Sequence, residues 1–266
     1  MLKSSGTNIK NKKLLLSNIL LILSAILLIG GIIYLSSDII KRHKRNAVIQ
    51  DATSDMEQVI ASNMAAIEAA GGDDSMLEEI EMTLVIDPNA IPVNGEEYDL
   101  YSDTYSEQAV AAGADSVNSE LDDAYTGYLT LRGIGIIDIP CIDCHIPIWE
   151  TTNTHTLRYG AGHYVNSVLP GSYGNCTIMG HHLIQYGGIF NRLEEVGVGD
   201  IVNITDIRGH QYTYFVDETM VVSPSEMLNM ISGGITDTRQ LTLVTCVYTD
   251  EGKMRYIVIG HIQDGT

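Results

Sequence analysis

Basic residues are scarce in most of this 266-residue sequence. Residues 46–266 contain seven Lys or Arg against 33 Asp or Glu, which gives this part a formal net charge of −26. Nucleic-acid-binding proteins draw much of their affinity from Lys and Arg side chains that neutralise phosphates. The scarcity therefore argues against a nucleic-acid partner. We expect the acidic charge to keep this part soluble and away from anionic lipid.

Cysteine is also uncommon, but two of the four cysteines form the pattern Cys141-Ile-Asp-Cys144-His145. C-x-x-C-H attaches haem in c-type cytochromes. That motif normally lies in helical backbone, which Pro147 opposes. A zinc site that adds Cys176 lacks a second closely spaced ligand pair. A local disulfide stays open as an alternative, and two small side chains in a β-hairpin are the favoured interpretation.

Metal-binding loops are missing as well. The abundant Asp and Glu do not follow the spacing of a calcium-binding loop, and a solvated acidic surface explains them better. We therefore expect no cofactor and no metal.

Charge is absent from one long stretch, the 22 residues from Leu14 to Leu35. As a helix this stretch spans roughly 30 Å, the thickness of a bilayer core. A secretory signal peptide would be shorter and would end in a small-residue cleavage site, which the following "SSDIIKRHKR" lacks. We predict a transmembrane anchor over residues 14–36, with residues 1–13 on one side. Four basic residues flank each end, so the positive-inside count does not choose the orientation.

The next part of the chain, residues 37–128, is acidic. Residues 46–70 place apolar side chains at helical spacing among Ala and Glu, and "GGDDS" at 71–75 ends that pattern. Residues 76–128 are rich in Tyr, Ser, Asp and Ala. We predict a partly helical stalk or appendage over residues 37–128.

The composition changes from residue 129. Short β-branched runs such as "GIGIIDIP", "NCTIMG" and "LTLVTCVY" alternate with Gly, Pro and Asn. Several short strands at this spacing predict an all-β barrel or sandwich. Residues 129–266 are enough for one such domain with its own core.

Three residue types in this predicted domain suit acyl transfer. Cys246 ends an apolar run, and Arg255 begins the next predicted strand. A hairpin with its turn near "TDEGK" brings these two residues together. Upstream, "IMGHH" presents His181 and His182 after another run. A nearby imidazolium favours the thiolate of a cysteine, and a guanidinium stabilises charge on a carbonyl oxygen.

Several motifs resemble those of sortases, the transpeptidases of Gram-positive cell surfaces. "TLVTC", which ends at Cys246, resembles the family signature T-L-x-T-C. "GIIDIPCIDCHIPIWETT" resembles the opening hairpin of the family. "LRYGAGHYVNSVLPGSYGNCTIMGHH" resembles the segment that leads to the catalytic histidine, and "FNRLEEVGVGDIV" the run that follows. The resemblance covers residues 130–263 and implies a closed sortase-type β-barrel of about eight strands with short helices.

The resemblance also implies roles for individual residues. The nucleophile falls on Cys246, the general acid/base on His181 and the oxyanion- or substrate-stabilising arginine on Arg255. His182 is the rival of His181, because a one-residue slip exchanges two side chains that face opposite ways on a strand.

Two further residues are predicted to bind substrate. Thr245 precedes the nucleophile, where backbone N–H groups help to hold an oxyanion. His163 in "GAGHY" matches an earlier, non-catalytic family position, and we interpret it as structural or groove-lining.

The reaction implied by the resemblance has two stages. Cys246 attacks the Thr carbonyl of an LPxTG-like sorting signal near the C-terminus of a surface or pilin protein. An amine from a peptidoglycan precursor or a pilin lysine then resolves the thioester. Both acceptors lie outside the cell, so the resemblance implies a single-pass membrane protein with a cytoplasmic N-terminus and an extracellular catalytic domain.

Two other functions remain as alternatives. A cysteine peptidase would use the same residues with water as the acceptor. A non-enzymatic surface or redox module would instead use Cys141, Cys144 and His145.

The sortase subclass rests on weaker signals. Pilin-polymerising sortases often carry a lid marked by Asp-Pro and an aromatic residue, whereas Asp87-Pro88-Asn89 lacks the aromatic and fits a turn better. The sequence contains no second apolar span after the β-domain. Residues 46–128 nevertheless exceed what a housekeeping enzyme needs. We therefore expect a surface-protein or pilus sortase of class C or D.

Overall fold

The computed structural model describes residues 5–74, 81–85, 128–153, 156–182, 189–231, 234 and 236–263. Asp87-Pro88-Asn89 and the rest of residues 86–127 lie outside the described residues. The chain divides into two compact units, residues 1–43 and residues 44–266, and each unit is described by itself. Helix α1 (Ser5–Ala69) contributes residues to both units.

The first unit contains the apolar part of α1. Among the described residues, Leu15–Tyr34 is one helical segment that is long and apolar enough to cross a membrane, with a mean hydropathy of 2.5 over 20 residues. Its side chains are exposed, Leu27 by 70%. A continuous apolar surface of this size is unfavourable in water and favourable in lipid. The segment therefore suits a single-pass membrane anchor.

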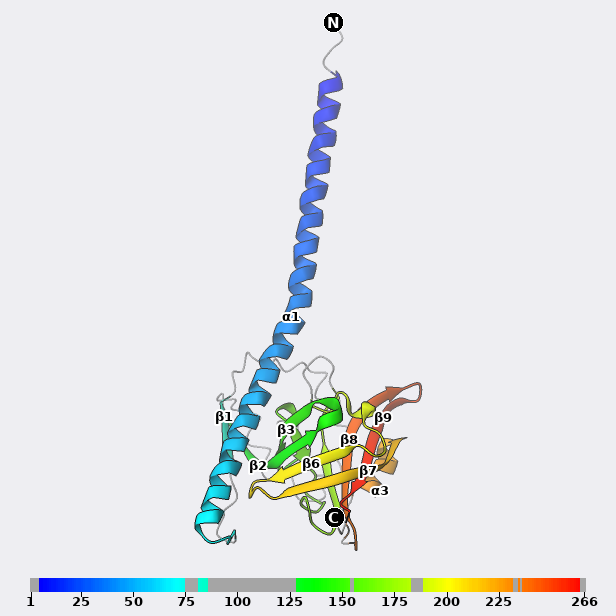
Figure 1. The fold of residues 1–266 in the computed structure, drawn as a ribbon. Helices are drawn as coiled ribbons and strands as arrows, with labels where there is room; N and C mark the ends of the chain where they lie inside the picture. Colours follow the sequence, from blue (N-terminus) through cyan, green and yellow to red (C-terminus); the bar gives the residue numbers. More distant parts are fainter. Residues whose placement is uncertain are drawn as a thin grey trace. The chain divides into compact units, whose positions relative to one another are not determined.

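The second unit is built on a closed β-barrel (Figure 1). Its eight strands are β2 (Tyr128–Ile139), β3 (Cys144–Trp149), β4 (Ala161–His163), β5 (Gly174–Met179), β6 (Ile201–Asp206), β7 (Gln211–Val222), β8 (Arg239–Thr249) and β9 (Gly252–His261). They are hydrogen-bonded in the order β2-β3-β4-β5-β8-β9-β7-β6, and β6 pairs with β2 to close the ring. The predicted all-β barrel of about eight strands is confirmed.

The second unit also contains shorter elements besides the eight barrel strands. Strand β1 (Glu81–Val85) pairs with the first part of β2, outside the ring. The short helices are η2 (Pro140–Ile142), η3 (Thr156–Arg158), η4 (Leu193–Glu195) and α3 (Pro224–Met230). Helix α3 begins with a capping box, in which the side chains of Ser223 and Glu226 each accept from the other residue's backbone N–H.

The ring closes at a glycine. Gly135 of β2 pairs with Asp206 of β6, just after a register shift in β2. A Cβ atom at Gly135 would overlap the carbonyl oxygen of Thr205. A side chain there would therefore force β2 and β6 apart, so glycine is required for barrel closure.

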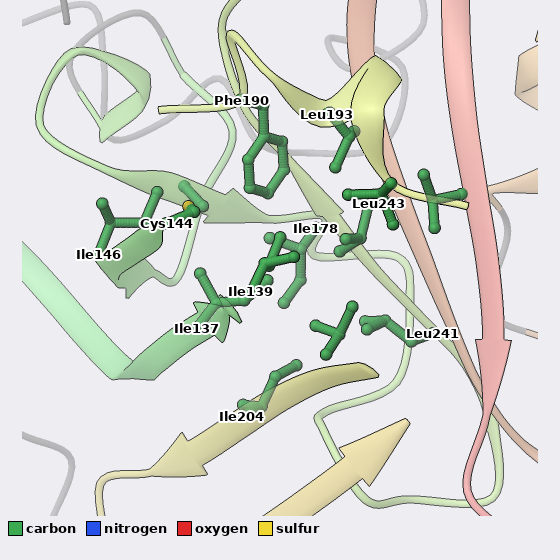
Figure 2. Packing of buried hydrophobic residues seen from close by; sticks show 14 of the residues in the cluster. Ile137, Ile139, Cys144, Ile146, Ile178, Phe190, Leu193, Ile204, Leu241 and Leu243 are labelled. Carbon is green, nitrogen blue, oxygen red and sulfur yellow. The ribbon is translucent and has the colours of Figure 1, made fainter. Parts of the chain in front are cut away.

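The barrel interior is filled by apolar side chains from most of its strands (Figure 2). Ile137 and Ile139 point inward from β2, while Asp138 between them is only half-buried. Leu241 and Leu243 point inward from β8. Each such side chain contributes about 1.5–3 kcal/mol when it is fully buried.

The outer face of β8 is also covered. A second apolar cluster, which we call the outer cluster, contains Val244, Ile257, Met179, Leu157, and Met227 and Ile231 of the α3 segment. β8 is buried on both faces from Leu241 to Cys246, and the two threonines in this run, Thr242 and Thr245, are buried as well.

The last turns of α1 pack on the barrel within the second unit. Ala52, Met56 and Ile60 recur every four residues on one helix face and are buried against Trp149 and its neighbours. Part of the predicted appendage over residues 37–128 is therefore a helix with an apolar face against the barrel. The predicted domain boundaries themselves stay predictions.

Candidate active site

The predicted nucleophile and the predicted arginine face each other in the β8–β9 hairpin. Cys246 lies directly opposite Arg255 in the antiparallel register. Opposed residues of such a pair project to the same face, with Cβ atoms about 5 Å apart. Each residue is only 1% exposed. The predicted hairpin is confirmed, and it makes Cys246 and Arg255 buried cross-strand neighbours, with Nη1 of Arg255 donating to the Met254 carbonyl at 3.1 Å.

His181 reaches the same level of the barrel from the neighbouring strand. Strand β5 runs parallel to β8, and its last pair is Met179 with Val244. The backbone N–H of Gly180 then donates to the Val244 carbonyl at 3.0 Å. Counting on by two residues from the Met179–Val244 pair brings His181 level with Cys246.

Side-chain alternation also puts these residues on one face. Val244 and Ile257 belong to the outer cluster, and Cys246 and Arg255 lie two residues from them on the same strands. Because strand side chains alternate with a period of two, Cys246 and Arg255 share the outer face. His181 lies two residues beyond another outer-cluster residue, Met179, and is 2% exposed. The three predicted catalytic residues are thus brought to one region of the barrel wall.

A hydrogen bond from Thr245 and close packing at Gly180 fix the backbone next to Cys246 and His181. The hydroxyl of Thr245 donates to the Gly180 carbonyl at 2.8 Å, which ties the residue before Cys246 to the residue before His181. A Cβ atom at Gly180 would lie 2.5 Å from the ring of Phe190, so only glycine fits there. The Thr245 side chain is used in this bond. Its predicted substrate-binding role therefore depends on its backbone and stays a prediction.

His182 makes a contact that the sequence did not reveal. Its Nδ1 lies 2.7 Å from the backbone carbonyl oxygen of Cys246. Since a carbonyl only accepts, the ring donates this hydrogen bond. The repeated histidine in "GHH" was the only available signal, and it identified His182 merely as a rival for the place of His181.

His163, the other predicted substrate-binding residue, is buried in a turn. Its Nε2 donates to the Val168 carbonyl at 3.0 Å and lies 3.1 Å from the hydroxyl of Ser167. Burial lowers the pKa of the His163 imidazole, while the bond to Val168 opposes this shift. These contacts agree with a structural role for His163, and its binding of substrate stays a prediction.

The other thiols lie in different surroundings. Cys144 and Cys176 are buried, and burial raises the pKa of each, that of Cys144 to about 12. Cys141 is exposed, and its pKa is raised by partial burial and by Asp200. All four cysteines are free of disulfides. Of the four, Cys246 is the one with an arginine as its cross-strand partner.

The Cys141-x-x-Cys144-His145 pattern does not converge on one point. It spans η2 and the start of β3, in the hairpin that joins β2 to β3. Cys144 is in the barrel core, with its thiol 3.4 Å from the Ile189 carbonyl oxygen. His145 points to the outer face, where its ring contacts Asp138 and Glu57. The alternation of β3 thus separates the two side chains, and the favoured hairpin interpretation is confirmed.

Comparison with known proteins adds an independent observation. The family model of the sortase domain matches residues 137–263. Sortase A of Listeria monocytogenes serovar 1/2a is 28% identical over 130 residues, which are 49% of this chain and 56% of that protein. The chain thus spans little more than half the length of this curated relative.

Two further similar proteins carry the same family name. YwpE of Bacillus subtilis (strain 168) is 30% identical over 91 residues, which are 34% of this chain and 85% of YwpE. The solved structure of a Clostridium perfringens sortase D5 transpeptidase is 27% identical with a TM-score of 0.44, covering 64% of this chain and 97% of that one. The motifs, the barrel and the match to 85% of YwpE lead to one conclusion: the chain belongs to the sortase family.

Proposed function

We propose that this chain is a membrane-anchored transpeptidase that cleaves an LPxTG-like sorting signal between Thr and Gly. The observation that carries the proposal is the cross-strand pair of Cys246 with Arg255, and His181 follows two residues after the adjacent strand β5 ends. A thiol, an imidazole and a guanidinium on one face form a complete set for acyl transfer.

The first stage forms an acyl-enzyme. The Cys246 thiolate attacks the Thr carbonyl carbon, and the carbonyl electrons move to the oxygen. The guanidinium of Arg255 stabilises that negative charge, and the low exposure of Arg255 strengthens the attraction. His181 protonates the leaving Gly amine as the C–N bond breaks, and a thioester remains on Cys246.

The second stage releases the product. An amine attacks the thioester carbonyl, His181 accepts a proton from that amine, and the thiolate of Cys246 leaves. The acceptor is a peptidoglycan precursor or a pilin lysine. Water in place of the amine would make the chain a cysteine peptidase, which is the main competing function.

The proposal includes a topology. Residues 14–36 cross the membrane once, residues 1–13 stay in the cytoplasm, and residues 37–128 and the catalytic domain over residues 129–266 lie outside. The apolar segment Leu15–Tyr34 supports the single span. The orientation follows from the acceptors, which are extracytoplasmic. We keep class C or D as the expected subclass.

Mass spectrometry of the full chain in detergent micelles tests the function. The protein is incubated with a library of LPxTG-type peptides, with and without an added amine such as triglycine. We expect a Cys246-dependent thioester that disappears into amine-ligated product, and no adduct with Cys246→Ala. Cys141→Ser is the matched control. Hydrolysed peptide that added amine leaves unchanged would favour the peptidase, and an adduct on another cysteine would contradict the proposed nucleophile.

A further inference from the structure

We propose that His182 is a positioning residue, which holds the backbone of the nucleophile through the hydrogen bond from its Nδ1 to the Cys246 carbonyl. The inference rests on the proposed function, since it takes Cys246 as the nucleophile. It concerns a second imidazole that the reaction described above does not use.

The position of the Cys246 carbonyl explains why a side chain is needed there. The Val244 carbonyl points toward β5, because it accepts from the N–H of Gly180. Carbonyl directions alternate along a strand, so the Cys246 carbonyl points the same way. The pairing of β5 with β8 ends at Met179 and Val244, two residues earlier. The Cys246 carbonyl therefore faces the point where the neighbouring strand has already ended.

The His182 ring supplies the donor at this point. Its Nδ1 lies 2.7 Å from the Cys246 carbonyl oxygen, which is a short distance for an N–H···O bond. Together with Gly180 N–H to Val244 and the Thr245 hydroxyl to Gly180, it makes the third link between the end of β5 and residues 244–246 in the middle of β8. These links continue the connection of the two segments past the last strand pair, as far as the nucleophile.

The same bond fixes the tautomer of His182. A neutral imidazole carries one proton, and the carbonyl requires it on Nδ1, so Nε2 carries a lone pair. The Nδ1 proton is thus engaged with the Cys246 carbonyl, which gives His182 a role in geometry. The role of general acid stays with His181, as the family resemblance implies.

The consequence for the reaction is a fixed backbone at Cys246. The direction of the thiol toward Arg255 and His181 depends on that backbone. Misplacing a reacting atom by about 1 Å can lower the rate roughly 100-fold. We therefore expect the loss of the His182 bond to lower kcat and to leave KM for the sorting peptide nearly unchanged.

The experiment compares two substitutions in the full chain in detergent. His182→Leu removes the donor, and we expect kcat to fall roughly 10- to 100-fold. His182→Asn keeps an N–H donor near the position of Nδ1 and has no titratable group. We expect His182→Asn to recover most of the lost kcat and to keep both limbs of the wild-type pH profile. His145→Leu, the same change at an exposed histidine of the β2–β3 hairpin, is the matched control.

A second test measures the histidine tautomers in the folded wild-type chain and does not depend on catalytic activity. Long-range proton–nitrogen NMR correlations of the histidine rings report which nitrogen carries the proton. We expect the Nδ1–H form for His182 and, as an internal reference, the Nε2–H form for His163, whose Nε2 faces the Val168 carbonyl. The His182 signal is assigned by its absence from the spectrum of His182→Asn.

The outcomes separate this inference from the proposed function. Wild-type turnover that survives Cys246→Ala would reject the proposed function, whereas the tautomer would still decide whether His182 donates its Nδ1 proton to the Cys246 carbonyl. An Nε2–H form of His182 would overturn the inference, as would His182→Leu with wild-type kcat. Loss of one limb of the pH profile in His182→Asn, with kcat as low as in His182→Leu, would instead identify His182 as the general acid.

Discussion

Two hairpins of the same barrel each carry a cysteine, and their chemistry differs. In the β2–β3 hairpin Cys144 lies opposite Ile139, and in the β8–β9 hairpin Cys246 lies opposite Arg255. Both thiols are buried. The first faces the apolar barrel core, and the second lies on the outer face with Arg255 as its cross-strand partner.

This difference shows that strand register decides chemistry more than spacing along the chain does. Cys141, Cys144 and His145 lie within five residues, yet alternation sends Cys144 into the core and His145 outward. Cys246 and Arg255 are nine residues apart, yet register makes them partners. Burial, with a smaller contribution from Asp138, raises the pKa of Cys144 to about 12, so this thiol stays neutral at physiological pH.

The largest expected effect comes from removing the thiol of the β8–β9 hairpin. Cys246→Ala should lower transpeptidation by at least about 10³-fold, because no other group there can form the thioester. Circular dichroism and the melting temperature should change little. The parallel substitution Cys144→Ala should keep turnover within about twofold of wild type. Equal losses in the two variants would remove the distinction between the hairpins.

The next effect comes from the cross-strand partner. Arg255→Ala should lower kcat about 10²- to 10³-fold, because the developing oxyanion loses its cation. Arg255→Lys keeps the charge but loses the planar fork, and it should recover only part of the rate. Kinetics with a fixed sorting peptide measure both variants. Wild-type kcat in Arg255→Ala would show that the pairing with Cys246 has no part in the reaction.

Much of the fold could be predicted from local patterns. β-Branched runs separated by Gly, Pro and Asn predicted the strands, and the turn at "TDEGK" predicted the β8–β9 pair. The pairing of β5 with β8 was not predicted from residue patterns. It is parallel and joins residues more than 60 positions apart, and no turn sequence specifies such a contact.

The candidate site was predictable to the same extent. Residue chemistry and the family resemblance selected Cys246, His181 and Arg255, and hairpin geometry joined two of them. The bond from His182 to the Cys246 carbonyl depends on where β5 stops pairing with β8, which is a tertiary feature. Helical periodicity likewise predicted the helix that contains Met56, but it did not predict that Met56 packs against the barrel.

A smaller effect concerns the alkaline stability of the β2–β3 hairpin. At neutral pH, Cys144→Ala should cost about 1 kcal/mol through the lost buried sulfur. In the folded wild type the pKa of Cys144 is raised to about 12, whereas an unfolded thiol titrates near pH 8.5. The unfolded state therefore loses this proton first as pH rises.

Wild-type stability should accordingly fall from about pH 8.5 toward pH 12, with a slope of up to about 1.4 kcal/mol per pH unit from this group. The alanine variant lacks this term, so it should become the more stable protein above about pH 9.5. Urea unfolding of both proteins between pH 7 and pH 10.5 measures the difference. A constant difference across that range would contradict a buried, neutral Cys144.

The smallest effect is expected from the exposed members of the same hairpin. His145 contacts Glu57 at 3.1 Å and Asp138 at 3.3 Å, and all three side chains are substantially exposed. Exposed pairs of this kind contribute about 0.2–1 kcal/mol, so Cys141→Ser with His145→Asn should lower stability by no more than that. Turnover should stay within about twofold of wild type, because neither β2 nor β3 neighbours β8, the strand of Cys246, in the sheet. A tenfold loss of kcat with an unchanged melting temperature would mean that the β2–β3 hairpin takes part in the reaction, and register alone would then not explain why the two hairpins differ.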